Sequence, residues 1–466
     1  MTTQHSRVMP FARTVGRRSF LRGAGLLAAG ATAVPLLSSC GGSGAGASDS
    51  LVVWWNQGFY PAQDEAVRAV AQAWSQQAGM PIDLQFYGTN DIPQKEQSAV
   101  AAGSTPDVLF AEINQSAKHA YEGLLADVSR VVEPMQITDG ARRSARLYNG
   151  EAEAASYYTV PLWQFTVSLF HWRSMLADIG MDHAQAPRDW DGYWGFWKQA
   201  QDAYRARGNN DVFAVGWPMG SAAGDTNYDT QQVLRAYGVE LLDDQNNLVT
   251  TDEVRRGVAD ALTWIVDLYK QGYSPADSLN WQDSSNNTYF LNRSVLCTPN
   301  GSLSMPGAIK EDEPEKWKDI VTTGFPDRAI GGPSPSITLL HSAAVFEASE
   351  KKDKALDFLS FFTRPENVIQ VLKGAQGRWA PVQTSLLEDP YFAQSDDPNV
   401  QAAIQQMSGQ TVPSWATLSP AYSQSERVQV WGNAIGRVAL QGASPQEGAD
   451  WALEQIQEQF KEFEVG

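Results

Sequence analysis

The segment from Asp225 to Asp229 carries oxygen-bearing side chains at the spacing of a calcium-binding loop. Asp225, Asn227 and Asp229 would supply ligands at loop positions 1, 3 and 5. However, position 6 is Thr230 where the loop needs glycine, and position 12 is Ala236 where it needs a bidentate glutamate. We therefore interpret the segment as a polar loop and predict no metal site.

Other catalytic signatures are missing from the sequence. The five histidines have no metal-ligand spacing, and there is no nucleophile elbow, phosphate-binding loop or dinucleotide-binding glycine motif. A pair of carboxylates could still cleave a glycosidic bond, because the separation of roughly 5 to 10 Å that this needs exists only in three dimensions. From these motifs we predict no enzymatic activity and no cofactor, and a glycoside hydrolase stays open as an alternative.

The composition is that of an acidic globular protein. The chain has 466 residues, 43% hydrophobic and 11% aromatic, which excludes a disordered chain and suggests about two or three domain-sized cores. Two cysteines are too few for a disulfide-stapled domain. The formal net charge of −18 argues against broad nucleic-acid binding, because phosphates need a basic field.

The elements that must position any site alternate between short apolar runs and amphipathic helices. Residues 51–55 predict a buried strand, and strands at 82–87 and 107–110 follow after intervening helices. This β-α-β-α-β order predicts an α/β fold with a mostly parallel, doubly wound sheet. Capping boxes at 250–253 and 444–447 predict the starts of two later helices.

The first forty residues have the layout of an export signal. Five arginines without an acidic residue precede an uncharged apolar run, residues 23–37, which is too short to span a bilayer. Residues 16–22 resemble the twin-arginine export signal, and the general secretory route is the alternative. Residues 37–40 resemble a bacterial lipobox, so we predict a signal peptide over 1–39 and lipidation of Cys40.

A flexible tether follows the lipobox. Residues 41–50 are rich in Gly and Ser, so residues 40–50 predict a lipid-anchored linker. The body is then exported and held at the outer face of the cytoplasmic membrane by lipid alone. The remaining thiol, Cys297, has no intramolecular partner, and we interpret it as a small buried hydrophobic residue.

After residue 50, several sequence blocks occur in an order typical of one family. They are Trp54-Trp55 at a strand end, the G-x-x-P-D-V-like Gly103 to Val108, Val160-Pro161-Leu162 before a strand at 168–172, Pro187-Arg188-Asp189-Trp190-Asp191, Asn300-Gly301-Ser302 and Gly331-Gly332. In order and spacing they resemble the extracellular solute-binding proteins of bacterial ABC importers, in the carbohydrate-binding, maltose-binding-protein-like branch. The resemblance runs from about residue 51 to the C-terminus.

This resemblance implies a two-lobed periplasmic-binding-protein (Venus-flytrap) fold. Each lobe is expected to be a mostly parallel sheet flanked by helices, with the ligand cleft at the hinge. The matching blocks place lobe 1 at 51–164 and 327–363, and lobe 2 at 165–326 and 364–466. Cleft residues are then expected at the carboxyl ends of strands, where open α/β sheets present their ligands.

The same blocks imply the site residues. A sugar needs flat aromatic surfaces for its C–H face, and amides, carboxylates or guanidinium groups for its hydroxyls. At Asn114 an amide replaces the acidic residue of the maltose-binding relative, and Leu303 replaces its cleft tryptophan. The predicted ligand-binding residues are Trp55, Asn56, Tyr60, Asn114, Trp163, Gln164, Trp217, Asp225, Trp281, Asn300, Ser302, Arg378 and Trp379.

The implied function is that of a monomeric, lipid-anchored component of an ABC importer. It would capture a mono- or oligosaccharide outside the cell and deliver it to a membrane permease. The acidic composition keeps a second ligand class open, because cations favour carboxylate-lined aromatic clefts. A polyamine or other small-solute receptor is therefore the alternative, supported by Asp225.

Overall fold

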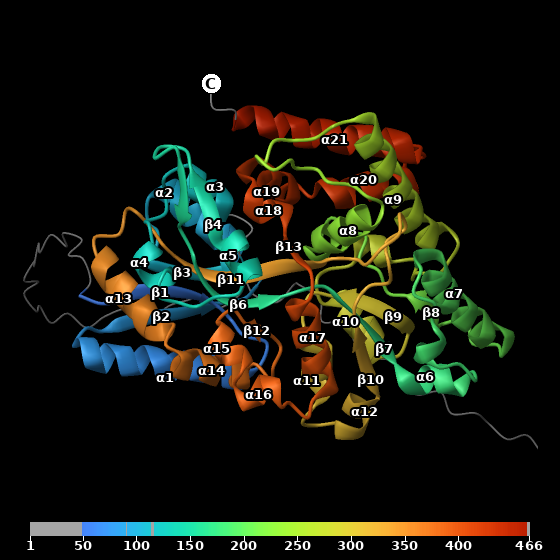
Figure 1. The fold of residues 1–466 in the computed structure, drawn as a ribbon, viewed down its shortest axis with the longest axis horizontal. Coiled ribbons are helices and arrows are strands. Elements are labelled where there is room, and N and C mark those ends of the chain that lie inside the picture. The colour runs from blue at the N-terminus through green and yellow to red at the C-terminus, as the bar shows by residue number, and fades with distance from the viewer. Residues whose placement is uncertain (1–48, 90, 113–115, 464–466) are drawn as a thin grey trace, which may run out of the picture. The chain divides into compact units, whose positions relative to one another are not determined.

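A computed structural model describes residues 49–89, 91–112 and 116–463. The predicted signal peptide, Cys40 and Asn114 lie outside these residues. Within them the strands form a 7-stranded sheet, a 4-stranded sheet and a 2-stranded sheet (Figure 1). No helix in this part of the chain combines the length and the apolar character needed to cross a membrane.

The 7-stranded sheet, here the larger sheet, collects strands from distant parts of the chain. Its strands are β1 (Leu51–Asn56), β2 (Ile82–Tyr87), β3 (Val108–Glu112), β6 (Val160–Phe165), β11 (Ser336–Val345), β12 (Ala380–Pro381) and β13 (Thr411–Pro413). Their order is β12-β6-β11-β3-β1-β2, with β13 paired to β11. β1 runs parallel to β2 and β3, whereas β11 runs antiparallel to β3 and β6.

The 4-stranded sheet, here the smaller sheet, has the order β10-β7-β9-β8. Its strands are β7 (Ser168–Trp172), β8 (Phe213–Val215), β9 (Val295–Asn300) and β10 (Ile320–Thr323), while β4 (Arg146–Asn149) pairs with β5 (Ala154–Tyr157). Only β8 and β9 pair in parallel here. Both sheets are thus mixed rather than mostly parallel, because β11 runs antiparallel to β3 and β6 in the larger sheet and β7 runs antiparallel to β9 and β10 in the smaller one.

Helices flank the larger sheet. α1 (Pro61–Ala78) starts with proline at its first position and ends at Gly79, whose φ of 64° lets its N–H reach the Ser75 carbonyl. α1 packs with α13 (Lys352–Phe362) and α14 (Pro365–Gly374), while α5 (Asp139–Ala145) packs on β6 and β11 (Figure 1). The other helices between residues 61 and 145 and between residues 352 and 393 are α2 (Ile92–Ala102), α3 (Ser116–Tyr121), α4 (Ser129–Val132), α15 (Thr384–Leu387) and α16 (Pro390–Ala393).

The remaining helices lie in residues 173–319 and 398–462. They are α6 (Arg173–Asp178), η2 (His183–Gln185), α7 (Trp190–Ala206), α8 (Asp225–Ala236), α9 (Asp252–Lys270), η3 (Ser278–Asn280), α10 (Ser285–Leu291), α11 (Ser304–Ile309), α12 (Pro314–Asp319), α17 (Pro398–Ser408), α18 (Trp415–Leu418), α19 (Pro420–Arg427), α20 (Val430–Leu440) and α21 (Pro445–Glu462). Thr251 caps α9 through the N–H of Val254, and Ser444 with Glu447 forms a capping box on α21. The predicted capping box of α21 is confirmed, whereas α9 begins beside the predicted position with Thr251 as its cap in place of a Thr250–Glu253 box.

The segment after α13 stays with the larger sheet. α14 packs on α1, and β12 pairs antiparallel with β6 through Ala380 and Pro381. The resemblance assigned residues from 364 onward to the second lobe, so the structure differs from that expectation over this segment. α17, farther along, contacts β10 of the smaller sheet.

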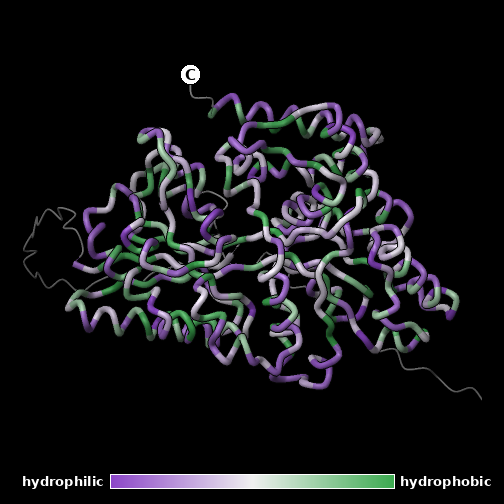
Figure 2. The backbone as a smooth tube through the Cα atoms, in the orientation of Figure 1, coloured by the Kyte–Doolittle hydropathy of each residue, from purple (hydrophilic) through white to green (hydrophobic). Residues whose placement is uncertain are grey.

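The core beside the larger sheet is built around Trp55. Burial alternates along β1, and Trp55 is fully buried on the inner face. Its ring stacks on Phe110 with 4.2 Å between centroids and lies 4.9 Å from Phe362 of α13. Figure 2 shows the apolar segments gathered along the strands. Because side chains alternate along a strand, Asn56 leaves the core face where β1 ends.

Candidate functional site

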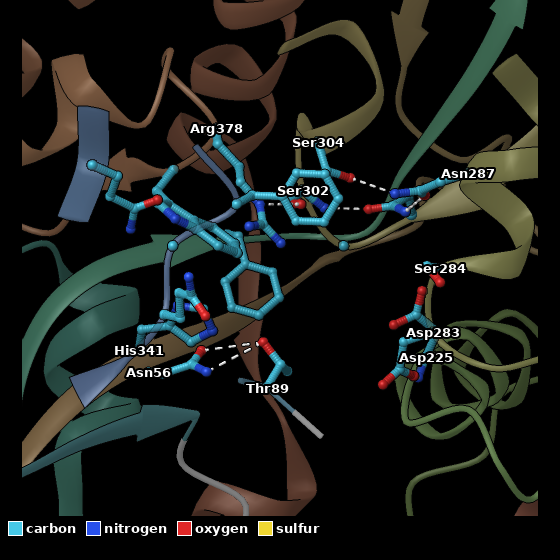
Figure 3. Close-up of a pocket in the computed structure, with 18 of the residues that line it drawn as sticks. Asn56, Thr89, Asp225, Asp283, Ser284, Asn287, Ser302, Ser304, His341 and Arg378 are labelled. Carbon is cyan, nitrogen blue, oxygen red and sulfur yellow. Dashed lines mark hydrogen bonds between the residues drawn. The ribbon is translucent and has the colours of Figure 1, made fainter. Parts of the chain in front are cut away.

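A cavity of about 320 Å³ lies between residues of the larger sheet and residues of the smaller sheet (Figure 3). Its walls come from the segment after β1, from β11 and the turn before β12, from α8, and from the segment between β9 and α11. The lining residues are Asn56, Gln57, Gly58, Phe59, Gln63, Thr89, Phe110, Phe165, Asp225, Tyr228, Gln282, Asp283, Ser284, Asn287, Asn300, Gly301, Ser302, Ser304, His341, Arg378 and Trp379. A volume of this size is typical of small-ligand sites.

One wall combines aromatic rings with a guanidinium group. The Cζ atom of Arg378 lies 4.8 Å from the ring centroid of Phe59 and 4.2 Å from that of Trp379. Its Nε donates a hydrogen bond of 3.1 Å to Ser302 Oγ. Phe59 is 50% exposed, whereas Trp379 is buried beside Phe165 with 5.1 Å between centroids. This wall offers a ligand aromatic surface, most of it from Phe59, and a fixed positive charge.

His341 of β11 supplies an uncharged imidazole to the same wall. Burial lowers its pKa to about 3, and the positive charge of Arg378 acts in the same direction. Nδ1 of His341 accepts a hydrogen bond of 3.0 Å from the indole N–H of Trp163. The ring also packs edge-on to Trp379, with centroids 4.5 Å apart. His341 therefore lines the cavity as a neutral side chain held in a fixed orientation.

A chain of amides and hydroxyls forms the wall near the smaller sheet. Asn300, at the end of β9, donates from Nδ2 to Asn287 Oδ1 at 2.6 Å and accepts the N–H of Ser302 at 2.9 Å. Asn287 in turn donates from Nδ2 to Ser304 Oγ at 3.0 Å (Figure 3). These mutual bonds fix the side chains before any ligand arrives, which lowers the entropic cost of binding.

Two carboxylates lie opposite His341 and Asn56 across the cavity (Figure 3). Asp283 accepts the backbone N–H groups of Gly224 and Asp225, at the N-terminus of α8. Burial raises the pKa of Asp283, and these two backbone hydrogen bonds oppose that rise. Asp225 accepts a hydrogen bond from Tyr228 and one of 3.4 Å from Asn286 Nδ2.

Two buried polar atoms of the lining have no hydrogen-bond partner among the described residues. They are Nε1 of Trp379 and Oε1 of Gln63. A buried donor or acceptor without a partner costs about 1 to 3 kcal/mol. A ligand or water that bonds to these atoms removes that cost, so both atoms are suited to ligand contact.

The cavity brings together six of the predicted site residues. Asn56, Asp225, Asn300, Ser302, Arg378 and Trp379 all line it. Tyr60 instead donates its hydroxyl hydrogen to the carbonyl of Ser304 at 3.0 Å, joining the segment before α1 to α11. Asn114 and the predicted lipidation site Cys40 lie outside the described residues.

The other predicted tryptophans pack in the interior rather than around the cavity. Trp55 is enclosed by Phe110 and Phe362, and Trp163 lies behind His341. Trp217 is fully buried against Trp194 and Trp264, and Trp281 packs on Tyr289 with 4.7 Å between centroids. Large aromatic side chains pack in a core as readily as against a ligand. The sequence positions of these tryptophans therefore did not distinguish core residues from cavity residues.

Gln164 also lies behind the cavity. It is buried on β6, donates to the carbonyl of Pro381 at 2.9 Å and accepts from Thr138 Oγ1 at 3.1 Å. These bonds tie β12 to β6 and so support the turn that carries Arg378 and Trp379. Gln164 therefore acts on the cavity through its neighbours.

Several lining residues of the cavity were not among the predicted site residues. Phe59, Thr89, Asp283, Asn287 and His341 line the cavity without having been predicted. Phe59 stands between two predicted residues, so its aromatic type beside Asn56 was an available signal. Asn287 and Asp283 lie in polar helical or turn segments far from any strand end, where the sequence carried no signal.

Solved structures of similar fold are solute-binding proteins. An ABC transporter solute-binding protein from Thermotoga lettingae bound with α-D-tagatose has a TM-score of 0.72 at 18% identity, covering 88% of this chain and 100% of that chain. Maltose-bound MalE3 of T. maritima has a TM-score of 0.70 at 17% identity, covering 87% and 99%. The GacH receptor of Streptomyces glaucescens, solved unliganded and with acarbose, has a TM-score of 0.70 at 18% identity, covering 89% and 100%.

These likenesses show the expected two-lobed periplasmic-binding-protein fold. A search among curated proteins found no match. Residues 69–402, more than half of the chain, match the family described as bacterial extracellular solute-binding protein. The expectation of a binding protein rather than an enzyme agrees with this match. The chain therefore belongs to the bacterial extracellular solute-binding protein family.

Proposed function

We propose that the protein captures a mono- or oligosaccharide outside the cell and delivers it to the permease of an ABC importer. The observation that carries the proposal is that the aromatic rings of Phe59 and Trp379 line the same cavity as the amides and hydroxyl of Asn287, Asn300 and Ser304. A pyranose presents apolar C–H faces and a rim of hydroxyls, which this pairing matches. The tagatose, maltose and acarbose in the similar structures support the same ligand class.

Closure of two lobes over the ligand is part of the proposal. We place lobe 1 at 51–164 and 327–363 and lobe 2 at 165–326 and 364–466. The exception is segment 364–381, which packs on the larger sheet and therefore moves with lobe 1. Residues from both sheets line the cavity, so a ligand that contacts both walls favours the arrangement in which they meet. Ligand binding stabilises the closed form relative to the open form by the difference between the binding free energies of the ligand for the two forms.

Attachment to the outer face of the cytoplasmic membrane is proposed from the lipobox that ends at Cys40. A lipidated cysteine followed by a Gly/Ser-rich linker keeps the binding protein, as a monomer, near the permease. The variant Cys40→Ala should appear in the soluble fraction, whereas the wild type should sediment with membranes. A wild-type protein that is fully soluble would remove the anchor from the proposal.

The test of the ligand class is a thermal-shift screen of the purified protein, followed by calorimetry on the ligands found. Mono- and oligosaccharides, polyols and polyamines are screened in parallel. A ligand that binds the folded state raises the melting temperature by mass action. We expect a rise with one class of sugar. A rise with polyamines and with no sugar would replace the proposal with the polyamine receptor.

A further inference from the structure

A second cavity of about 320 Å³ adjoins the one described above. The two share Asn56, Thr89, Asp225, Tyr228 and Asp283, so they meet at these residues. The second cavity extends between α2, the start of α8 and the connection from α19 to α20. A ligand held in the first cavity can therefore place a substituent in the second.

The lining of this second cavity is rich in carboxylates. Glu96, Asp225, Asp283 and Glu426 line it, and the one basic side chain among its described lining residues, Arg427, is exposed. Glu96 is 8% exposed and Glu426 is 6% exposed. Carboxylates this deeply buried need hydrogen-bond donors or positive charge close by.

The existing contacts of two of these carboxylates leave acceptor capacity. Oε1 of Glu96 lies 3.1 Å from Nδ1 of His119. Asp283 accepts two backbone N–H groups at the start of α8, both on Oδ1. Because an ionised carboxylate has about four acceptor positions, each of these two groups can still accept hydrogen bonds from a ligand.

Buried amide oxygens are a second, independent indication that this cavity suits a ligand with hydrogen-bond donors. Oδ1 of Asn227 and Oε1 of Gln429 are buried without a hydrogen-bond partner among the described residues, and both residues line the second cavity. Asn227 is 4% exposed, and its Nδ2 donates to the backbone carbonyl of Glu426 at 3.4 Å, which orients Oδ1. The second cavity therefore presents carboxylate and amide oxygens as acceptors, which fits a ligand with hydrogen-bond donors.

We propose that the second cavity, here the amine compartment, binds the ammonium group of an aminated sugar whose ring occupies the first cavity. The inference rests on the proposed function and narrows its ligand class. An ammonium group offers three N–H donors and no acceptor, whereas a hydroxyl offers one donor and carries no charge. Hydrogen bonds between an ammonium and a carboxylate are roughly twice as strong as neutral ones.

The test compares sugars that differ only in the substituent at one position of each ring. The β-1,4-linked disaccharides of glucosamine, N-acetylglucosamine and glucose form one matched set, and hexoses with the amine at other ring positions form further sets. Calorimetry at a pH where the amine is protonated should give a dissociation constant about ten-fold lower for the aminated member of one set, a difference of about 1.4 kcal/mol. Equal or weaker binding of the aminated member in every set would overturn the inference.

Variants identify where the amine lies. Glu426→Gln removes a carboxylate charge at constant size, and Gln429→Met removes an unpartnered acceptor. Each should reduce the advantage of the aminated sugar at least about three-fold and leave the affinity for the hydroxyl sugar unchanged, which also shows that the variant is folded. Glu454→Gln, at an exposed carboxylate on α21, is the matched control and should retain the full advantage.

The outcomes separate the inference from the function on which it rests. Neutral sugars that bind without any preference for the amine leave the sugar-binding proposal standing and overturn the amine compartment. Binding of spermidine with no binding of any sugar overturns both. An equal loss of affinity for aminated and hydroxyl sugars in Glu426→Gln also overturns the amine compartment, because the carboxylate would then serve the whole ligand.

Discussion

The indole N–H of Trp163 donates a hydrogen bond of 3.0 Å to Nδ1 of His341, and this bond fixes how the histidine meets the cavity. Because Nδ1 accepts, the neutral imidazole carries its proton on Nε2. The low pKa of His341, caused first by burial and then by Arg378, keeps the ring uncharged. A buried tryptophan thus sets the donor pattern of a lining residue without touching the cavity itself.

The variant Trp163→Phe should weaken ligand binding without removing the fold. It keeps a ring in the core but leaves Nδ1 of His341 without its donor, so the imidazole can change its tautomer. We expect a loss of about 1 kcal/mol, or about five-fold in affinity, measured by calorimetry together with ¹⁵N spectra of the histidine ring. Trp172→Phe is the matched control, because Trp172 Nε1 donates to the carbonyl of Phe290 away from the cavity. Unchanged tautomer and affinity in Trp163→Phe would contradict the prediction.

Phe59 and Trp55 should separate binding from stability. Phe59 is half exposed in the cavity, so Phe59→Ala should lower sugar affinity about ten-fold while the free energy of unfolding changes by less than about 0.5 kcal/mol. Trp55 is fully buried, so Trp55→Ala should lower the free energy of unfolding by about 3 to 5 kcal/mol. Urea denaturation and calorimetry on both variants check this, and a stable Trp55→Ala would show that its core role is misjudged.

Asp229→Asn should stabilise the protein at neutral pH. Asp229 is fully buried, and neither carboxyl oxygen has a hydrogen-bond partner among the described residues. Burial raises its pKa well above the usual value, and the nearby charge of Asp225 raises it further. A raised folded pKa gives stability that is present below the unfolded pKa of about 3.9 and lost as pH rises through the folded pKa.

Asp229→Asn removes this loss of stability at higher pH, because asparagine does not ionise. Melting temperatures of Asp229→Asn and wild type should therefore be similar near pH 4 and diverge at higher pH, with the variant melting higher. Asp244→Asn removes the same charge at an exposed position and is the control, with little change expected. A variant that melts lower than wild type at pH 7 would show that the Asp229 carboxyl makes a stabilising contact.

Acid should weaken the fold through two buried histidines. Burial lowers the pKa of His171 to about 3, with the charges of His183 and Arg173 acting in the same direction, and His341 is lowered to about 3 as well. Between pH 6.5 and about 3 the unfolded chain binds protons at both positions and the folded chain does not. Their stability contribution is complete above about pH 6.5 and falls by about 1.4 kcal/mol per pH unit per histidine as pH decreases.

Replacing His171 isolates its share of this effect. Both of its ring nitrogens are buried without a hydrogen-bond partner among the described residues. His171→Leu therefore removes a polar side chain without breaking a hydrogen bond between described residues. The unfolding free energy of His171→Leu, measured in urea at pH 7 and at pH 5, should depend less steeply on pH than that of the wild type. An equal slope in the two proteins would exclude His171 as a source of acid sensitivity.

The sequence could predict features that depend on near neighbours. The caps of α9 and α21 rest on residues three apart, and Asn56 ends a strand that its apolar run predicts. Trp55 and Trp379 could not be ranked in the same way, because burial or exposure of an aromatic ring depends on distant packing partners.

The unpredicted lining residues share one physical reason. His341 stands alone in an apolar strand, where a histidine is indistinguishable from a core residue until Trp163, 178 positions away, is placed beside it. Asp283 reaches the start of α8 across 59 positions. Contacts at such separations follow from the arrangement of the two sheets, which local patterns do not encode.

The direct passage from β6 to β7 limits how the protein can evolve. Thr166 and Val167 are both buried, and they join a strand of one sheet to a strand of the other with no loop between them. An insertion here would alter the register of two sheets at once, whereas an insertion in the exposed turn at 243–247 would disturb neither sheet. Among descendants of this chain, length changes should therefore accumulate at such peripheral turns and be purged at residues 166–167.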